Sequence, residues 1–577
     1  MGAWHRTFFK ITDWISGYTL EDAAGDLKGG LTTGFILIPQ GMAYAVIAGV
    51  PPIYGLYAGL IPLLIYPLFT TSRHLSIGPV AIDMLIVAAG FGAVAASVNN
   101  DYLGYVLLLT LITGILQLGM GLLRLGSLFN FFSRPVISGF VMAAPLIIAL
   151  TQLENLFGIQ LNGSHNMIRL AGEFLSEFNH IHLATLWWGV ASMAVLLLLK
   201  RVAPKWPGSV LVLGLSLIAA WLSGIEQQNV AIVGSIPAGL PPLSLPPVGY
   251  ESVTTLLPTA LTLALVQFMT ITSLSNLFAK RHGYLVDSSQ ELVSLGASNI
   301  TGSFFSSLPV SSSISRSAAS EQAGARTPLS NVITAVIILL TLLFLTPLFY
   351  YLPMPVLASI IIVAVFGLID IEELKFLIKT RKSEGGIALF TFFCTLFIGI
   401  QEGILLGIGV SMLVMLVKVS RPDVAELGVI PNTRSFKNLK RNPDARRIDG
   451  ILILRIDASF SFMNAEFFRD FILEKSRQQS PDTRHVIIDG SSMNMLDTTA
   501  IDSLISIIKT LRQWEMDLYL TGLKGPIRDI IHRSGFEEYL GSDHFHRTPH
   551  MAVKRILQIL DEEDDGGRSN QYESYSF

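Results

Sequence analysis

The chain has 577 residues, of which 51% are hydrophobic and only 14% are charged, and its formal net charge is -3 at pH 7. This balance is typical of a protein with many membrane-spanning segments and excludes an ordinary soluble enzyme. The basic residues neither form one block nor alternate with aromatic residues, so the charge gives no support for a nucleic-acid partner.

Apolar runs bounded by Pro, Gly and charged residues predict about fourteen membrane segments between residues 27 and 418. We expect residues 1–26 to form a cytoplasmic N-terminal segment and residues 27–420 to form the transmembrane domain. Lysine and arginine residues fall in alternate connections, which the positive-inside rule places in the cytoplasm. The chain is therefore predicted to be a multi-pass protein of the cell membrane with both termini in the cytoplasm.

Two polar interruptions divide the apolar runs at matching places. They are HLSIGPVAID (residues 74–83) and LPVSSSISRS (residues 308–317). The interruptions lie 236 residues apart (315 − 79), and the first segments of the two halves begin 229 residues apart (256 − 27). This spacing predicts two repeats of seven segments, and an odd number makes the second repeat inverted. Segments 3 and 10 are then expected to be half-helices that meet near the middle of the membrane.

Arg316 lies in the serine-rich stretch of residues 306–320, at membrane depth. An arginine there costs about 2.5–3.5 kcal/mol on insertion scales, so it is usually kept for an anion, an ion path or a buried partner. Half-helix N-termini carry unpaired N–H groups and a positive dipole end, which favour an anion. We therefore expect anion handling; the alternative is a structural pair of Arg316 with a carboxylate or with helix carbonyls.

Four blocks of the chain resemble the signature blocks of the SulP anion transporters, the sulfate permease family. They are PQGMAYAVIAGVPPIYGLYAG (39–59), HLSIGPVAI (74–82), HGYLVDSSQELVSLGASNITGSFF (282–305) and SISRSAASEQAGARTPL (313–329). The resemblance covers nearly the whole chain. It implies a core domain that moves against a gate domain, usually in a homodimer, followed by a cytoplasmic STAS domain. Substrates in this family include sulfate, bicarbonate, chloride and dicarboxylates.

The resemblance also implies a set of substrate-binding residues. It matches the anion-pocket positions of the first segment with Gln40 and Tyr44, those of the tenth with Ser315 and Arg316, and third-segment backbone with Ala81 and Ile82. An amide, a phenol, a hydroxyl and a guanidinium all donate hydrogen bonds to a doubly charged oxyanion. Ordinary hydrogen bonding between helices is the alternative for Gln40 and Tyr44.

The chain departs from the family pattern at two positions. Many proton-coupled members have a glutamate in the eighth segment, where this chain has Thr270 in the run VQFMTI. In the third segment, Asp83 stands where an apolar or hydroxyl residue is expected. We hypothesise that Asp83 replaces the missing glutamate as a proton or sodium site; the alternative is a static salt bridge or a lumen-facing carboxylate. Thr270 and Thr272 are further candidates for the coupling ion, although a threonine in a membrane helix often bonds its own backbone.

The last part of the chain is expected to be soluble. Residues 421–448 are predicted to be a linker, residues 449–560 an α/β domain that resembles a STAS domain, and residues 561–577 an acidic disordered tail. In related domains a turn at the position of Asp497 to Thr499 is phosphorylated, which makes Thr498 a regulatory candidate. Capping of a helix by Asp497 and Thr498 is the favoured alternative.

The remaining motifs point away from covalent chemistry. No catalytic triad, phosphate loop or ATP-binding motif is present, so we expect no enzymatic activity and no cofactor. Cys394 is the only cysteine, and no metal site is expected. The sequence therefore predicts a secondary active anion transporter, with sulfate as the expected substrate and proton symport, sodium symport or anion exchange as coupling. A bicarbonate or dicarboxylate transporter, an uncoupled chloride channel and a membrane-anchored STAS signalling protein are the alternatives. The expected partners are the lipid bilayer, a second copy of the chain and a cytoplasmic protein that binds the STAS domain.

Overall fold

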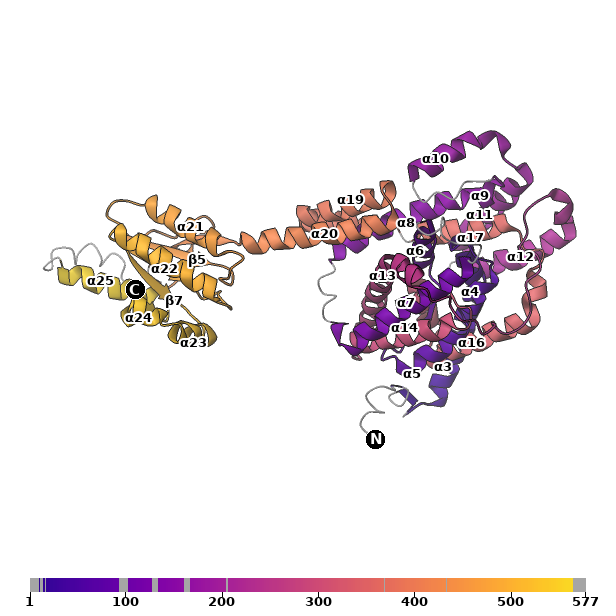
Figure 1. The fold of residues 1–577 in the computed structure, drawn as a ribbon, viewed down its shortest axis with the longest axis horizontal. Helices are drawn as coiled ribbons and strands as arrows, with labels where there is room; N and C mark the ends of the chain where they lie inside the picture. The colour runs from indigo at the N-terminus through magenta and orange to yellow at the C-terminus, as the bar shows by residue number, and fades with distance from the viewer. Residues whose placement is uncertain are drawn as a thin grey trace. The chain divides into compact units, whose positions relative to one another are not determined.

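The computed structural model describes residues 17–92, 102–126, 133–159, 167–203, 206–367, 369–431 and 433–563, together with residues 10, 14 and 15 (Figure 1). Contacts divide the chain into two compact units, Met1–Ser411 and Met412–Phe577. The domain bounds expected from the sequence stay a prediction.

The first unit is almost entirely helical. In its first half the helices are α3 (Leu20–Ile47), α4 (Ile53–Tyr57), α5 (Ile61–Phe69), α6 (Ala81–Gly92), α7 (Tyr102–Leu122), α8 (Arg134–Thr151), α9 (Leu153–Phe157), α10 (Met167–Ser176), α11 (Leu183–Val202) and α12 (Gly208–Ser223). In its second half they are α13 (Tyr250–His282), α14 (Ser288–Ser303), α15 (Ile314–Ala323), α16 (Leu329–Leu340), α17 (Met354–Phe366), α18 (Ile371–Thr380), α19 (Lys382–Phe397) and α20 (Ile400–Ser420), the last of which runs into the second unit.

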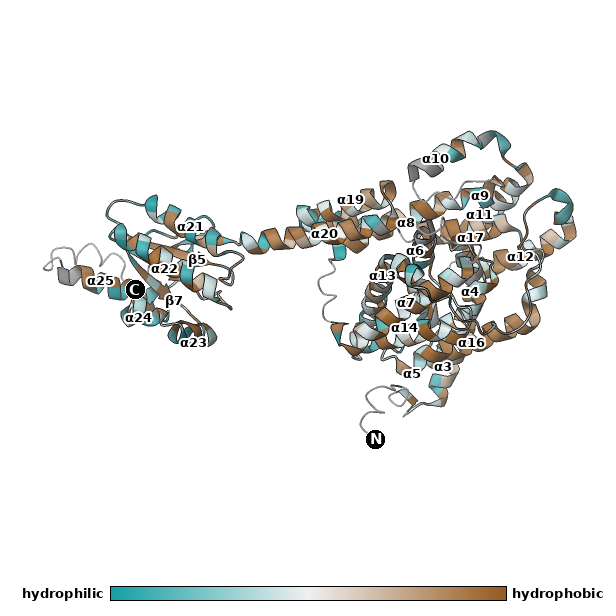
Figure 2. Cartoon of the chain, viewed as in Figure 1, coloured by the Kyte–Doolittle hydropathy of each residue, from teal (hydrophilic) through white to brown (hydrophobic). Residues whose placement is uncertain are grey.

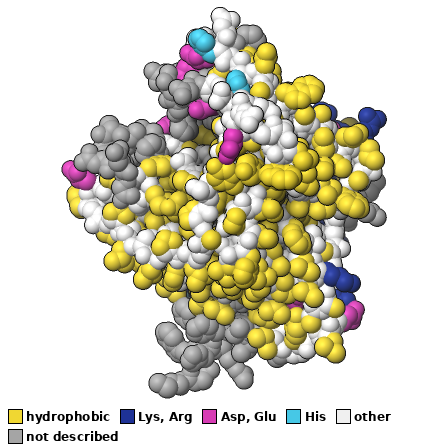
Figure 3. Space-filling view, turned by 90° about the vertical axis from the view of Figure 1, so that its right-hand side faces the viewer, with side chains coloured by type: hydrophobic (Ala, Val, Ile, Leu, Met, Phe, Trp, Pro, Cys, Tyr) yellow, Lys and Arg dark blue, Asp and Glu magenta, His cyan; other side chains and the backbone are white. Residues whose placement is uncertain are grey.

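Apolar side chains cover much of the outside of this unit. Among the described residues, eight helices are long and apolar enough to cross a membrane, and three shorter apolar helices accompany them. Large apolar residues such as Trp187, Leu198 and Trp221 are exposed. Figure 2 shows hydrophobic residues along many of the helices, and Figure 3 shows hydrophobic side chains spread over one face. Helices of this length with an apolar outer surface are typical of a protein that faces lipid. The predicted helical membrane body is thereby confirmed, whereas the order of fourteen segments stays a prediction.

Two short helices interrupt this body where the sequence predicts half-helices. Helices α6 and α15 have 12 and 10 residues, so they are about 18 Å and about 15 Å long, against a hydrocarbon core of about 30 Å. Each follows an extended segment, and the two segments pair antiparallel as β1 (Ile77–Gly78) and β2 (Ser311–Ser312). The pairing brings the starts of both half-helices together, from positions more than two hundred residues apart in the chain.

The second unit is an α/β domain with one six-stranded sheet of order β4-β3-β5-β6-β7-β8. The strands are β3 (Val424–Val429), β4 (Phe436–Asn438), β5 (Ile451–Ile456), β6 (His485–Asp489), β7 (Asp517–Thr521) and β8 (Phe545–His546). The helices are α21 (Ala465–Arg477), α22 (Thr498–Gln513), α23 (Gly525–Arg533), α24 (Phe536–Leu540) and α25 (Pro549–Glu563). Strands β5 to β8 are parallel, whereas β3 pairs antiparallel with both β4 and β5.

Alternation along β5 divides this domain into two cores. Leu452 and Leu454 face a core that includes residues of α21 and α22, whereas Ile451 and Ile453 face a smaller core that includes residues of α25. Successive side chains of a strand point to opposite faces, so a continuous apolar strand needs helices on both sides.

Two details of the second unit differ from the sequence prediction. The range 421–448, predicted to be a linker, contains β3 and β4. The sequence prediction missed these strands because a six-residue strand and a three-residue edge strand give only a weak alternation signal. Helix α25 continues to Glu563, inside the range 561–577 predicted to be disordered. The rest of that tail, residues 564–577, lies outside the described residues.

Candidate functional site

Helix α15 begins with serines that fix the position of Arg316. Ser313 is the N-cap of the helix, and its hydroxyl accepts a hydrogen bond from the backbone N–H of Arg316 at 3.4 Å. The hydroxyls of Ser313 and Ser315 lie 3.2 Å apart. Serine is a strongly preferred N-cap because its side-chain oxygen satisfies an orphan N–H group of the first turn. The half-helix therefore presents Arg316 from its N-terminal end, where the helix dipole is positive.

Arg316 is fully buried and only partly hydrogen-bonded. Its Nη1 donates to the carbonyl of Pro79 at 3.0 Å and to Gln40 Oε1 at 3.3 Å. The Nε and Nη2 groups are buried and have no hydrogen-bonding partner among the described residues. A buried charged donor without a partner is costly, so these two N–H groups are the strongest indication of a ligand in this unit.

Gly78 makes room for the guanidinium. Its φ angle is +146°, a left-handed conformation that favours glycine, and a Cβ atom at this position would lie 3.1 Å from Arg316 Nη2. The β1 segment therefore approaches Arg316 with backbone alone. Any larger residue at position 78 would both strain the backbone and press on the unpaired Nη2 group.

The other predicted substrate-binding residues surround the start of the two half-helices. Gln40 and Tyr44 are one turn apart on α3, so they share a face; Gln40 accepts from Arg316, and Tyr44 interacts with it electrostatically. Ala81 and Ile82 are the first residues of α6, where the N–H groups of a helix have no intrahelical acceptor. Ser315 is exposed at the start of α15. The structure thus brings Gln40, Tyr44 and Arg316 together directly and joins the α6 side through Pro79.

The three coupling-ion candidates have different surroundings. Asp83 is 2% exposed, and its Oδ2 accepts a hydrogen bond of 2.9 Å from Gln267 Nε2. Its charge interacts with that of Arg316. The Thr270 hydroxyl donates to the carbonyl of Val266 on its own helix, which is the alternative considered for it. The Thr272 hydroxyl is buried and has no hydrogen-bonding partner among the described residues.

Sequence reasoning missed a set of buried amides next to Asp83. Gln117 of α7, Gln267 of α13 and Asn299 of α14 are all 0% exposed and hydrogen-bond to one another. The one signal in the sequence was an amide side chain in each of three segments of the predicted transmembrane domain, which is costly in a membrane unless the amide has partners. Their meeting is visible only in three dimensions.

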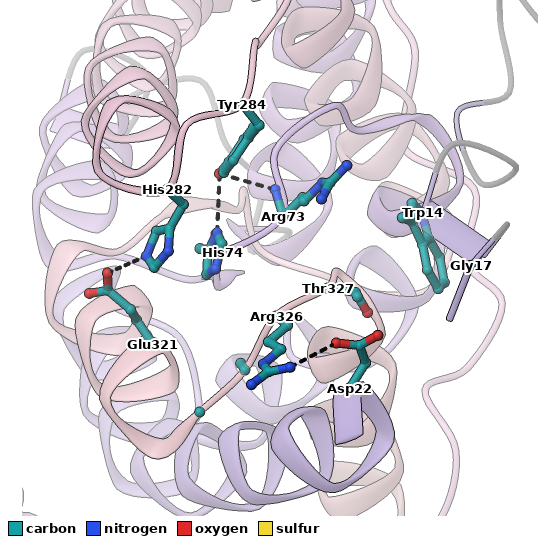
Figure 4. A pocket seen from close by; sticks show the side chains of 12 residues that line it. Trp14, Gly17, Asp22, Arg73, His74, His282, Tyr284, Glu321, Arg326 and Thr327 are labelled. Atoms are coloured by element: carbon teal, nitrogen blue, oxygen red, sulfur yellow. Dashed lines mark hydrogen bonds and ion pairs between the residues drawn. The ribbon is translucent and has the colours of Figure 1, made fainter. Parts of the chain in front are cut away.

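A cavity of about 430 Å³ lies where α13 ends and α3 begins (Figure 4). His74 stacks on His282 there with ring centroids 4.0 Å apart, and His282 Nε2 lies 2.6 Å from Glu321 Oε1. His74 lies in the connection between α5 and α6; burial, and then the neighbouring His282, lower its pKa to about 4. Arg73 and Tyr284 lie on the same cavity. The cavity is lined by residues other than those predicted to bind the anion.

Thr498, the regulatory candidate of the second unit, is the first residue of α22 and is exposed. Asp497 is the N-cap; its Oδ1 accepts from the N–H of Ala500 at 2.9 Å and its Oδ2 from the N–H of Phe462 at 2.8 Å. The carboxylate thus performs the capping role considered in the sequence. Among the described residues, no three His, Cys, Asp or Glu side chains group as metal ligands would.

Comparisons with known proteins agree with this architecture. The model of the sulfate permease family matches residues 24–391, and that of the STAS domain matches residues 442–552. The chain is 33% identical to sulfate transporter 4.1, chloroplastic, of Arabidopsis thaliana, over 96% of this chain and 84% of that protein. It is 31% identical to high affinity sulfate transporter 1 of Stylosanthes hamata, over 94% and 85%.

Solved structures share the fold. The murine solute carrier 26 family member A9 anion transporter in the inward-facing state has a TM-score of 0.89 at 23% identity, over 97% of this chain and 95% of that chain. The transmembrane domain of a cyanobacterial bicarbonate transporter has a TM-score of 0.59 at 22% identity, over 68% and 98%. The chain therefore belongs to the sulfate permease family, whose members are anion transporters and not enzymes, and it ends in a STAS domain.

Proposed function

We propose that this transporter carries sulfate, bound between the starts of α6 and α15. The observation that carries the proposal is the buried guanidinium of Arg316, whose Nε and Nη2 groups have no partner among the described residues. The two plant relatives described above are named sulfate transporters, which supports sulfate as the substrate.

The chemistry of the site suits a doubly charged oxyanion. Nε and one Nη group form an edge of the guanidinium that matches two oxygens of such an anion. The amide nitrogen of Gln40, the hydroxyls of Tyr44 and Ser315 and the first N–H groups of α6, at Ala81 and Ile82, supply further donors around the same point. Two helix dipoles add partial positive charge. Together these groups replace the hydration that sulfate loses on entering the membrane.

Transport would follow from alternating access. Residues of α3, α6 and α15 are tied together by the β1–β2 pair and by Arg316, so they would move as one core body past the remaining helices. In transporters built from inverted repeats, such a body carries the site from one side of the membrane to the other. Asp83 would bind the coupling proton or sodium ion, with Thr270 and Thr272 as secondary candidates.

We further propose that the transporter lies in the cell membrane as a homodimer with both termini in the cytoplasm. The STAS domain would regulate transport or bind a cytoplasmic protein, and phosphorylation of the exposed Thr498 would place a negative charge at the N-terminus of α22.

Uptake of radiolabelled sulfate into proteoliposomes tests this proposal, with and without an inward proton gradient or a sodium gradient. We expect saturable uptake that one gradient accelerates, and a loss of about 100-fold or more in Arg316→Gln. Arg484→Gln, which removes an exposed ion pair of the second unit, is the matched control and should keep full uptake.

Competitors distinguish the alternatives, because bicarbonate and dicarboxylates offer oxygens to the same donors. If unlabelled bicarbonate or a dicarboxylate is carried and sulfate is not, the substrate proposal is wrong. A chloride current without saturation would indicate a channel, and an intact chain without any transport would indicate a signalling role.

A further inference from the structure

A chain of buried amides connects Asp83 to the backbone of another segment. Gln267 Nε2 donates to Asp83 Oδ2 at 2.9 Å. Gln267 Oε1 accepts from Gln117 Nε2 at 2.7 Å and from Asn299 Nδ2 at 3.2 Å. Asn299 Nδ2 also donates to Gln117 Oε1 at 2.9 Å, and Asn299 Oδ1 accepts from the backbone N–H of Val310 at 2.9 Å. Four segments, α6, α7, α13 and α14, thus share one network that ends just before β2.

The backbone N–H of Val310 sets the direction of every bond in this network. A backbone N–H can only donate, so the Asn299 oxygen must face Val310 and the Asn299 nitrogen must face the two glutamines. The oxygen of Gln267 is then occupied by donors, and its nitrogen is left to point at Asp83. If the Gln267 side-chain amide were rotated by about 180°, its nitrogen would face the nitrogens of Gln117 and Asn299, and donor would face donor. Asp83 Oδ2 is therefore held as an acceptor, and a proton has no room on that oxygen.

The hydrogen bond to Asp83 favours its ionised form. A donor that faces one oxygen stabilises a carboxylate more than a neutral acid, and the effect is larger in a buried chain of bonds that polarise one another. No other hydrogen bond to Asp83 comes from the described residues, so Gln267 supplies the hydrogen-bonded part of this stabilisation, in addition to the charge of Arg316. Asp83 Oδ1 is left available to a ligand.

We propose that Gln267 is the positioning residue that keeps Asp83 a carboxylate beside the anion site, with Gln117 and Asn299 holding its amide in the required orientation. The inference rests on the proposed coupling role of Asp83 and deepens it. Asp83 and Arg316 balance each other in the empty site, so sulfate alone would add two uncompensated negative charges. A cation on Asp83 Oδ1 reduces that excess, which makes co-transport of a cation the favourable mode.

Infrared spectroscopy of the purified full-length protein tests the inference without any transported substrate. The contribution of Asp83 is the difference between the native protein and Asp83→Asn at pH 7. We expect the spectrum of the native protein minus that of Asp83→Asn to contain a carboxylate band. In Gln267→Met, which keeps the side-chain length and removes the donor, we expect this band to be replaced by that of a protonated carboxyl group.

Two further variants keep the test decisive if Gln267→Met folds poorly. Gln117→Met removes one of the two donors that hold the Gln267 oxygen, so the conversion should be partial. Thr262→Val removes a buried hydroxyl of the same helix whose one hydrogen bond among the described residues is to the carbonyl of Pro258, and it should leave the Asp83 bands unchanged.

Either of two results would overturn the inference: a protonated carboxyl band of Asp83 in the native protein, or an unchanged carboxylate band in both glutamine variants. A purely structural role of Gln267 would lower the yield of folded protein without moving the Asp83 bands. Since the measurement needs no sulfate, a failure of the sulfate proposal leaves these results unaltered, and the two failures can be told apart.

Discussion

Glu291 and Asp83 are both buried acids of the transmembrane unit, 0% and 2% exposed, but their surroundings differ sharply. Glu291 accepts hydrogen bonds from the hydroxyls of Tyr66, Thr70 and Thr71 and from the N–H groups of Thr71 and Ser72, all within 3.0 Å. Asp83 accepts from Gln267 among the described residues. The region between α5 and α14 thus surrounds its acid with donors, whereas the region between α6 and α13 does not.

This difference separates an acid that holds the fold together from one that keeps capacity for a ligand. Each donor to Glu291 fixes the end of α5 and the following connection against α14, and no lone pair remains for an ion. Asp83 has unused acceptor capacity next to an arginine with unused donors. Asp83 on α6 and Arg316 on α15 thus both keep unused hydrogen-bonding capacity where the two half-helices meet. This is the property expected of a site that binds an anion and a cation together.

Replacing Glu291 by Gln should weaken the contact of α5 and the following connection with α14, without changing the transport mechanism. The amide nitrogen would face donors in a buried site, at a cost of about 3 kcal/mol in stability. We expect a clear fall in the midpoint of thermal unfolding in detergent, with sulfate uptake per folded molecule close to native. An unchanged midpoint together with lost coupling would make Glu291, and not Asp83, the coupling residue.

Replacing Asp83 by Asn should have the opposite outcome. The Asn oxygen can still accept from Gln267, so the loss of stability should be smaller than in Glu291→Gln. An amide cannot take up a proton and offers sodium no negative charge, so the acceleration of uptake by a gradient should fall by about tenfold, or about 1.4 kcal/mol. Gradient-driven uptake at the native rate would remove Asp83 from the coupling mechanism.

The second unit offers the smallest test, through His546 at the end of β8 and His550 at the start of α25. Burial lowers the pKa of His546 and His550. A lowered pKa in the folded state means that the unfolded chain binds protons more readily, so stability is lost as pH falls below about 6.5. We expect amide hydrogen exchange in α25, corrected for its intrinsic rate, to increase between about pH 7 and about pH 5.5. Helix α22 is the internal reference, and equal behaviour of both helices would contradict the expectation.

Sequence alone predicted the parts of the site that leave a local signal. The serine-rich break before Arg316 and the break before Asp83 stand out because polar residues interrupt long apolar runs. Gln40 and Tyr44 have no such signal, since an amide and a phenol on an apolar helix are ordinary, and they were found through family resemblance. Their hydrogen-bonded or electrostatic contact with Arg316 comes from the structure.

The amide network and the first strands of the sheet were missed for physical reasons. Gln117 and Gln267 are 150 residues apart and Gln117 and Asn299 are 182 apart, so their contact depends on the packing of α7, α13 and α14. Strand β4 has three residues at the edge of its sheet, too few for an alternation pattern. In both cases long-range packing, which one sequence does not reveal, decided the structure.

Equilibrium binding of radiolabelled sulfate to the purified protein tests the anion site most directly, in the native protein and in Arg316→Gln and Arg316→Lys. We predict saturable binding to the native protein and a loss of affinity of at least about tenfold in both variants, because glutamine lacks the charge and lysine lacks the fork of donors. Native-like sulfate binding by correctly folded Arg316→Gln would contradict an anion site at the meeting point of the two half-helices.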